Sequence, residues 1–260
     1  AICEPKVDNM LLLPPTYGMY QVCADIQQVA TRKSNLTENF QLNLGEIATK
    51  VDEQTKIIWV CSPNNPSGNL LNYADVETLL NTYKSCLIII DEAYIDFAAE
   101  PSFITKLNTY ENLVVLQTFS KAWGMAGLRV GMAYAHVDLI KILNKIKYPY
   151  NLNQESQKLI LEAINNVEKK NIYVEKILKE RFRLFKKLME LDNVRHIYPS
   201  DSNQLLIKFT NAKAVFSYLI DRKVIVRDRS NVTLCDDCLR ISVGTRAENK
   251  ALMAELEGFK

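Results

Sequence analysis

The fold is decided by residues 118–131, which read TFSKAWGMAGLRVG. Lys121 lies just beyond the apolar run at residues 113–116, among hydroxyls, glycines and one arginine. An ammonium near the edge of a sheet is costly to desolvate, so we expect the pKa of Lys121 to fall. A neutral amine can then attack an aldehyde and form an imine. The alternative is an ordinary surface lysine on a loop.

Apolar runs without alternation recur before and after this stretch. They cover residues 57–61, 87–90, 113–116 and 130–135. Continuous apolarity is typical of strands that are buried on both faces. Helical signals separate the runs, such as Asn43 followed by Glu46 and the spacing of apolar residues in 73–83. This alternation predicts an α/β fold with a mostly parallel sheet sandwiched by helices.

The pattern changes after residue 152. Residues 153–191 read as long charged helices with apolar residues three and four apart. The remainder predicts a smaller C-terminal α+β domain, with strands at 204–209, 224–227 and 239–243, a helix at 212–222 and a last helix capped by Thr245 and Glu248. We therefore divide the chain into a large domain (1–152), connecting helices (153–191) and a small domain (192–260).

Charge and hydropathy exclude two classes of partner. The 32 basic and 30 acidic residues of the 260 are spread along the chain and give a net charge of +2. No basic stripe for nucleic acid results. No apolar run approaches the roughly 18 residues that a membrane span needs, and the first residues lack the order of a signal peptide. We expect neither a nucleic acid nor a membrane as partner.

The six cysteines are scattered, several of them inside apolar runs. This use is typical of reduced cysteines that act as small hydrophobic residues, and it favours a cytoplasmic location. Cys235 and Cys238 have the spacing of a zinc or redox motif, but no second pair accompanies them and the chain has only two histidines. We expect no metal site.

Two further motifs end apolar runs. Residues 61–68 read CSPNNPSG, and residues 91–94 read DEAY directly after the run at 87–90. Open α/β proteins bind ligands at the carboxyl ends of their strands, so we expect both motifs to lie near Lys121. Taken singly, Asn-Pro-x-Gly is only a turn, and an acid after a strand can be a helix cap.

These motifs, in this order, resemble those of the fold-type I aminotransferases. The resemblance narrows to the histidinol-phosphate aminotransferase family and covers essentially the whole chain. The segments that carry it are residues 14–20 (PPTYGMY), 61–68, 91–97 (DEAYIDF), 120–129 and 238–246 (CLRISVGTR). It implies a pyridoxal 5′-phosphate (PLP) cofactor and transfer of an amino group between glutamate or 2-oxoglutarate and imidazole-acetol phosphate or histidinol phosphate, a step of histidine biosynthesis.

The resemblance also implies a role for each matching residue. Lys121 would hold the cofactor as an imine and later move the proton of the substrate carbon. Asp91 would pair with the protonated pyridine nitrogen and keep the ring an electron sink. The other cofactor contacts implied are Asn65 and Tyr94 at the phenolic oxygen, Tyr17 on the ring face, and Thr118, Ser120 and Arg129 at the phosphate.

Substrate anions need further cations. Arg240 resembles the arginine that aminotransferases use for a substrate carboxylate, and Arg227 resembles one that assists with the substrate phosphate. For both, a salt-bridged surface arginine is the alternative. Arg229 and Arg246 stay unassigned.

Members of the family also carry features that lie before Ala1 in this sequence. These are an N-terminal arm, a tyrosine lent to the neighbouring subunit and a helix whose N-terminus binds the cofactor phosphate. We expect a segment to precede Ala1. The resemblance further implies a homodimer.

Two other functions fit the same motifs. A sister enzyme, either an aromatic-amino-acid aminotransferase or a phosphothreonine-type decarboxylase, would share the cofactor residues and differ in its substrate contacts. A non-catalytic scaffold would keep the fold without the reaction.

Overall fold

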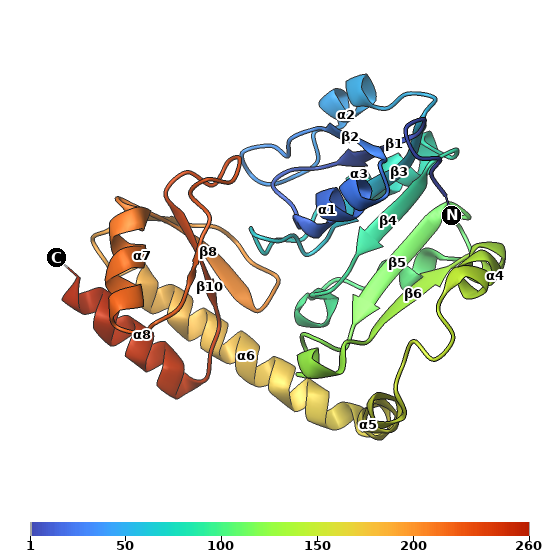
Figure 1. Cartoon of the computed structure of the whole chain (residues 1–260). Coiled ribbons are helices and arrows are strands. Elements are labelled where there is room, and N and C mark those ends of the chain that lie inside the picture. The colour runs from blue at the N-terminus through green and yellow to red at the C-terminus, as the bar shows by residue number, and fades with distance from the viewer. Residues whose placement is uncertain (1, 260) are drawn as a thin grey trace.

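The computed structural model describes residues 2–259 and contains two sheets joined by a long helix (Figure 1). The larger sheet has six strands in the order β2-β1-β3-β4-β5-β6. Its strands are β1 (Asn9–Leu12), β2 (Ala30–Lys33), β3 (Thr55–Cys61), β4 (Leu87–Asp91), β5 (Leu113–Thr118) and β6 (Gly131–Ala135). All neighbours are parallel except β6, which runs antiparallel to β5. The predicted mostly parallel sheet is confirmed.

Helices lie on both faces of this sheet. They are α1 (Met19–Ile26), α2 (Leu44–Lys50), α3 (Tyr73–Thr82) and α4 (Val137–Ile146), with short 3-10 turns η1 (Ile95–Phe97), η2 (Phe103–Lys106) and η3 (Ala126–Leu128). The predicted cap of α2 is present, since the Asn43 side chain accepts from the Glu46 amide. Helix α4 was not predicted; the His136 side chain caps it by accepting from the Asp138 amide.

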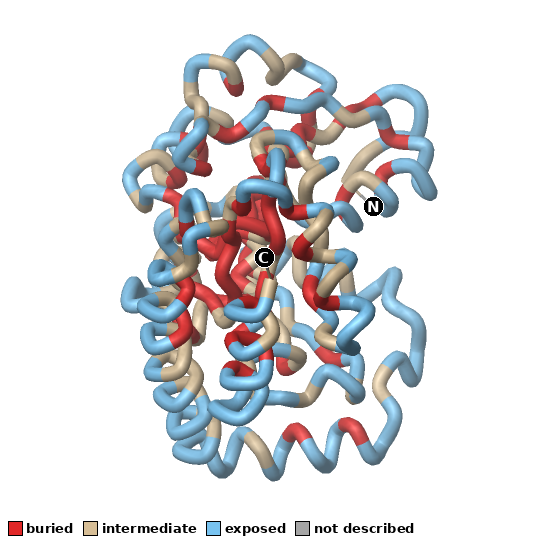
Figure 2. Tube along the Cα trace, turned by 90° about the vertical axis from the view of Figure 1, so that its left-hand side faces the viewer, coloured by how far each residue is buried: buried red, intermediate tan, exposed pale blue. Residues whose placement is uncertain are grey.

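The two faces of the sheet are buried to different degrees. Under α2 and α3, side chains such as Ile58, Ile88 and Val115 are fully buried in the main core. On the other face Ile89 is buried, while Trp59 is only partly covered. Among the described residues, the face of the sheet under α2 and α3 is fully buried as expected, whereas the other face is only partly covered. Figure 2 shows the buried residues gathered in the strands at the centre of the molecule.

The smaller sheet is antiparallel throughout, in the order β7-β8-β10-β9. Its strands are β7 (Val194–Ile197), β8 (Gln204–Phe209), β9 (Arg227–Asp228) and β10 (Cys238–Ser242), with α7 (Ala212–Asp221) and α8 (Arg246–Gly258) beside it. The predicted strand at 224–227 is wrong in its first part. Residues 224–226 follow directly on the turn that ends α7 and are not in a strand, because Lys223 has a φ of 62° and the Val224 amide donates to the Leu219 carbonyl.

Helices α5 (Gln154–Ile164) and α6 (Val167–Leu188) connect the sheets, and α6 extends from beside the smaller sheet to below the larger one in Figure 1. The parts also share a core, since Leu206 of β8 and the buried Cys235 and Cys238 join the main cluster of the larger sheet. The division at residues 152 and 191 stays a prediction.

Within residues 2–259, none of the helices is long and apolar enough to cross a membrane. Over the same residues, no group of three or more histidine, cysteine or acidic side chains could hold a metal ion. Burial raises the pKa of the Cys235 thiol to about 12 and that of Cys238 to about 11, so both thiols are protonated at neutral pH.

Candidate active site

The carboxyl ends of three neighbouring strands bring the predicted motifs together. Cys61 ends β3, and Asp91 ends β4 directly opposite it in the parallel pair. Thr118 ends β5, and the turn that follows carries Lys121. The Nζ atom of Lys121 lies 5.1 Å from the centroid of the Tyr94 ring. Residues far apart in the sequence therefore meet at one edge of the sheet, as the strand pattern predicts.

Lys121 carries the amine of this edge. Partial desolvation lowers the pKa of Lys121, and the nearby Arg240 and Arg129 cations lower it further, while Asp91 opposes them. A depressed pKa increases the fraction of neutral amine at physiological pH. The environment thus favours an amine that attacks carbonyl carbon.

Asp91 is a partly buried carboxylate with two donors. Its Oδ2 atom accepts 2.6 Å from the Tyr20 hydroxyl, and its Oδ1 atom accepts 3.0 Å from the Ala93 amide. Burial raises the pKa of Asp91, whereas the two hydrogen bonds and Lys121 act to lower it. Tyr20 was assigned no role from the sequence. The signal that could have found it is its spacing, because a residue three positions after Tyr17 at the start of a helix lies close to Tyr17.

Two tyrosines flank the lysine and the acid. Tyr94 is buried, and burial raises the pKa of its hydroxyl to about 12, so it stays a neutral donor. Tyr17 is 44% exposed, and its ring meets the Tyr20 ring edge-on at 5.5 Å. An exposed aromatic face at this edge can stack on a flat ligand.

An amide and a guanidinium connect the two sheets at the same place. The Arg240 Nη1 atom of β10 donates 2.6 Å to Oδ1 of Asn65. Because the oxygen of Asn65 is used in this way, its Nδ2 group is left to donate to a ligand. The Arg240 Nε atom is buried and has no protein partner among the described residues.

Further arginines surround Arg240. Arg227 of β9 lies directly opposite it across the antiparallel pair, so the two side chains leave the same face of the sheet. Burial lowers the pKa of Arg240, and Arg229 and Arg227 add to this, while Tyr94 opposes it. The Nε atom of Arg229 is also buried without a protein partner within residues 2–259. Clustered cations with unused donors are suited to an anionic ligand. Arg246, the first residue of α8, is exposed.

The turn after β5 carries the predicted phosphate ligands. The Thr118 hydroxyl donates 3.2 Å to the Val130 carbonyl and accepts 3.0 Å from the Ser120 amide, so it shapes the turn. Arg129 is left-handed with a φ of 57°, and its Nη1 atom donates 2.9 Å to the Ala126 carbonyl. The Thr118 hydroxyl is thus already used within the protein, whereas the Ser120 hydroxyl and the remaining N–H groups of Arg129 can donate to a ligand.

Comparison with known proteins identifies the family. Residues 1–256 match Aminotransferase class I and II. The chain belongs to this family. It is 48% identical, over all of its length and 74% of the relative's, to a histidinol-phosphate aminotransferase of Cytophaga hutchinsonii. Members of this family are PLP-dependent, and the chain is a PLP-dependent aminotransferase.

Solved structures agree on the fold of this aminotransferase. The histidinol-phosphate aminotransferase of Clostridium acetobutylicum has a TM-score of 0.91 at 23% identity, covering 97% of this chain and 78% of that one. The enzyme of Sinorhizobium meliloti, solved with pyridoxal-5′-phosphate, has a TM-score of 0.89 at 21% identity, covering 98% and 71%. The fold-type I architecture is thereby confirmed.

The donor set of the aminotransferase fits its cofactor. PLP needs an amine for its aldehyde, an anion for its ring nitrogen, donors for its phenolic oxygen and cations or hydroxyls for its phosphate. The same edge offers Lys121, Asp91, the Asn65 amide with Tyr94, and Ser120 with Arg129. Each group of PLP therefore has a side chain of suitable charge or hydrogen-bonding type at this edge.

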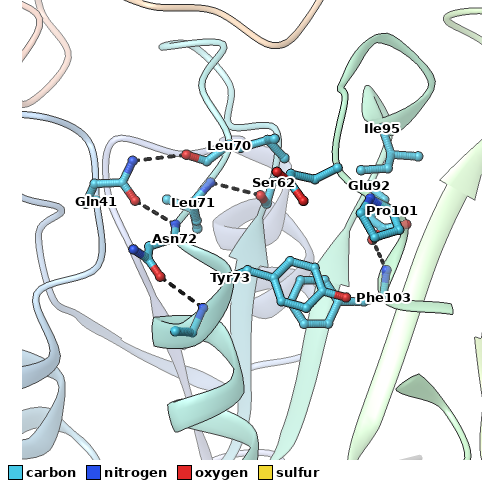
Figure 3. Close-up of a pocket in the computed structure, with 12 residues that line it drawn as sticks. Gln41, Ser62, Leu70, Leu71, Asn72, Tyr73, Glu92, Ile95, Pro101 and Phe103 are labelled. Carbon is cyan, nitrogen blue, oxygen red and sulfur yellow. Dashed lines mark hydrogen bonds between the residues drawn. The ribbon is translucent and has the colours of Figure 1, made fainter. Parts of the chain in front are cut away.

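A cavity of about 560 Å³ lies beside this edge, over the start of α3 (Figure 3). Its walls include Ser62 and Glu92, the neighbours of Cys61 and Asp91. Successive strand residues point to opposite faces, so this cavity and the Asp91 carboxylate lie on different sides of the sheet. The Glu92 carboxylate is held there by Ser102, Phe103 and Gln117. The cavity of the aminotransferase is thus separate from its candidate active site.

Proposed function

We propose that this aminotransferase transfers the amino group of glutamate to imidazole-acetol phosphate and forms histidinol phosphate and 2-oxoglutarate in histidine biosynthesis. The observation that carries the proposal is the 48% identity, along the entire chain, to a histidinol-phosphate aminotransferase. The cluster of Arg240, Arg227 and Arg229 supports it, since both substrates are anions.

The proposed chemistry begins with Lys121 and Asp91. When bound, PLP supplies an aldehyde and a ring that accepts electrons from the substrate carbon. Lys121 would hold the cofactor through its amine and would serve as the base that moves the proton of that carbon. Asp91 would keep a proton on the ring nitrogen, because a nearby carboxylate stabilises a cation.

The remaining contacts orient the cofactor. Asn65 and Tyr94 would donate to the phenolic oxygen, and Tyr17 would cover one face of the ring. The phosphate is assigned to Ser120 and Arg129, with Thr118 shaping their turn. These assignments follow from the donors that each side chain has left after its bonds within the protein.

The substrate contacts are assigned to the arginines. Arg240 pairs with the carboxylate of glutamate, since its fork is oriented by Asn65. Arg227, on the same face of the small sheet, pairs with the phosphate of the second substrate.

A half-reaction tests the proposal. Full-length protein loaded with PLP is mixed with histidinol phosphate, and the cofactor absorbance is followed together with the product. Rapid conversion of the cofactor to its amine form supports the proposal. Release of carbon dioxide would instead indicate a phosphothreonine-type decarboxylase, and preference for phenylpyruvate an aromatic enzyme. A protein that fixes no cofactor to Lys121 would be a scaffold.

We also infer a homodimer. Large apolar side chains are exposed on α4, α5 and the segment between them, including Ile146 (59%), Tyr148 (84%), Tyr150 (97%) and Leu161 (62%). Exposed apolar surface of this extent supports an interface between subunits. Light scattering on full-length protein should give twice the subunit mass, and a monomer at all concentrations would contradict the inference.

A cytoplasmic location is part of the same proposal. All six cysteines are free and four are buried, which suits a reducing compartment. Recovery of the protein outside the cytoplasmic fraction of fractionated cells would contradict it.

A further inference from the structure

Tyr20 makes the shortest side-chain contact to the acid of the active site. Its hydroxyl donates 2.6 Å to Oδ2 of Asp91, while the Ala93 amide takes Oδ1. A carboxylate with one donor on each oxygen cannot rotate without losing a bond. Each oxygen still has a lone pair for a further donor.

The Tyr20 ring is itself held firmly. It is 5% exposed, stacks on Trp59 at 4.3 Å and 13°, and meets Tyr17 edge-on. Its neighbours Leu12 and Cys61 belong to the same buried cluster. The hydroxyl therefore reaches Asp91 from a rigid support on α1.

We propose that Tyr20 is a positioning residue, whose hydroxyl fixes the orientation of the Asp91 carboxylate and keeps it ionised for a cationic ring nitrogen. The proposal rests on the role of Asp91 in the proposed function. Burial alone favours the protonated acid, which cannot serve as counter-ion. The hydrogen bond from Tyr20 opposes this effect.

The groups around Asp91 allow this hydroxyl to act as a fixed donor. They are Tyr20 of α1, Cys61 of β3, Glu92 and Tyr94 after β4, and Lys121 after β5. Burial raises the pKa of Tyr20 far above its ordinary value, and those of Cys61 and Tyr94 to about 12. All three are neutral when Asp91 titrates. Glu92 has a raised pKa and bonds away from Asp91, to Ser102 and Gln117.

The test is the titration of Asp91 in cofactor-free, full-length protein. Aspartate labelled with 13C at its carboxyl group reports the midpoint separately from Glu92, and Asp91→Asn assigns the signal. Tyr20→Phe keeps the ring and removes the hydroxyl. We expect the Asp91 midpoint to rise by about one to two pH units, because a hydrogen bond to an ionised group has been lost.

Tyr73→Phe is the matched control. Tyr73 also stacks on an aromatic ring, that of Phe103 at 3.9 Å, and its buried hydroxyl has no protein partner within the described residues. This variant should leave the Asp91 midpoint unchanged. In the PLP-loaded enzyme, Tyr20→Phe should shift the acid limb of the kcat profile upward by the same amount and leave KM for glutamate nearly unchanged.

An unmoved Asp91 midpoint in folded Tyr20→Phe protein overturns the proposal. If that variant does not fold, 3-fluorotyrosine at position 20 keeps the ring and strengthens the donor. The midpoint should then fall, and an unchanged midpoint again overturns the proposal. A shift in the cofactor-free protein without aminotransferase activity would contradict the proposed function and still support the coupling of Tyr20 to Asp91.

Discussion

Arg240 and Asn65 are 175 residues apart in sequence, and a 2.6 Å hydrogen bond joins Arg240 Nη1 to Asn65 Oδ1. The bond links β10 of the smaller sheet to the turn after β3 of the larger one. It places a guanidinium against the edge that carries Lys121, and it uses the Asn65 oxygen while leaving the amide nitrogen to donate elsewhere. One contact thus orients a proposed substrate ligand and a proposed cofactor ligand together.

Replacing Arg240 by lysine should weaken this arrangement. A lysine keeps the charge but loses the planar fork, so it cannot hold Asn65 and a carboxylate in the same geometry. We predict that Arg240→Lys raises KM for glutamate about tenfold or more, the equivalent of one strong hydrogen bond. Arg222→Lys is the control, since Arg222 pairs with Glu255 on the far side of the small sheet. Equal KM values in the two variants would contradict the assignment.

Asp91→Asn should make the protein more stable at neutral pH while lowering its activity. Burial raises the pKa of Asp91 above its ordinary 3.8, so the folded state holds this proton more tightly than the unfolded state. Stability from this group is therefore greatest below pH 3.8 and falls as pH rises through the folded pKa. Asp91→Asn should melt at a higher temperature than wild type at pH 7, and the gap should close at low pH.

The same variant should lose kcat by about two to three orders of magnitude, because a neutral amide cannot stabilise a cationic ring nitrogen. Asp138→Asn, at an acid with a 68% exposed side chain, is the control and should change neither quantity. A melting temperature for Asp91→Asn below that of wild type at pH 7 would mean that the hydrogen bonds of Asp91 outweigh its burial.

Gly68→Ala should destabilise the contact between the two sheets. Gly68 has a φ of 86°, and an added Cβ would lie 2.6 Å from the Ser200 hydroxyl oxygen. Its carbonyl also accepts 2.7 Å from the Asp201 amide, so the turn cannot shift freely. We predict a loss of about 1 to 2 kcal/mol in unfolding free energy, measured in urea. Gly127→Ala, where a Cβ meets nothing within 4 Å, should cost less.

The pH at which Lys121 reacts gives a fourth test. Desolvation and Arg240 lower its pKa from the ordinary 10.5, and the amine reacts only when deprotonated. The rate at which cofactor-free protein captures an aldehyde should rise with pH to a midpoint below 10.5. Arg240→Met removes a neighbouring cation and should move the midpoint upward, whereas Arg222→Met should not. An unchanged midpoint in Arg240→Met would mean that Arg240 does not affect the pKa of the Lys121 amine.

The features that could be predicted from the sequence are those that depend on a few neighbouring residues. Unbroken apolar runs located β3, β4 and β5, and the residue types that follow them put Asp91, Asn65 and Lys121 at one edge. Side-chain caps were equally readable, since Asn43 and Thr245 each accept from the amide three residues on. In these cases the physical cause lies within a few neighbouring residues.

Contacts between distant segments could not be read in this way. The bond from Tyr20 to Asp91 depends on how α1 packs against β3, and Arg229 joins the arginine cluster only after β9 pairs with β10. Strand β9 was misplaced because the left-handed Lys223 keeps the chain turning past the end of α7. A run of valine and isoleucine gives no sign of such a turn.

The most direct test of the account is borohydride reduction of full-length protein incubated with PLP, followed by peptide mapping. Reduction converts an imine to a stable amine and so marks the lysine that formed it. We predict one labelled residue, Lys121, and no label or turnover in Lys121→Ala. A label on another lysine, or covalent cofactor and full turnover in Lys121→Ala, would contradict the account.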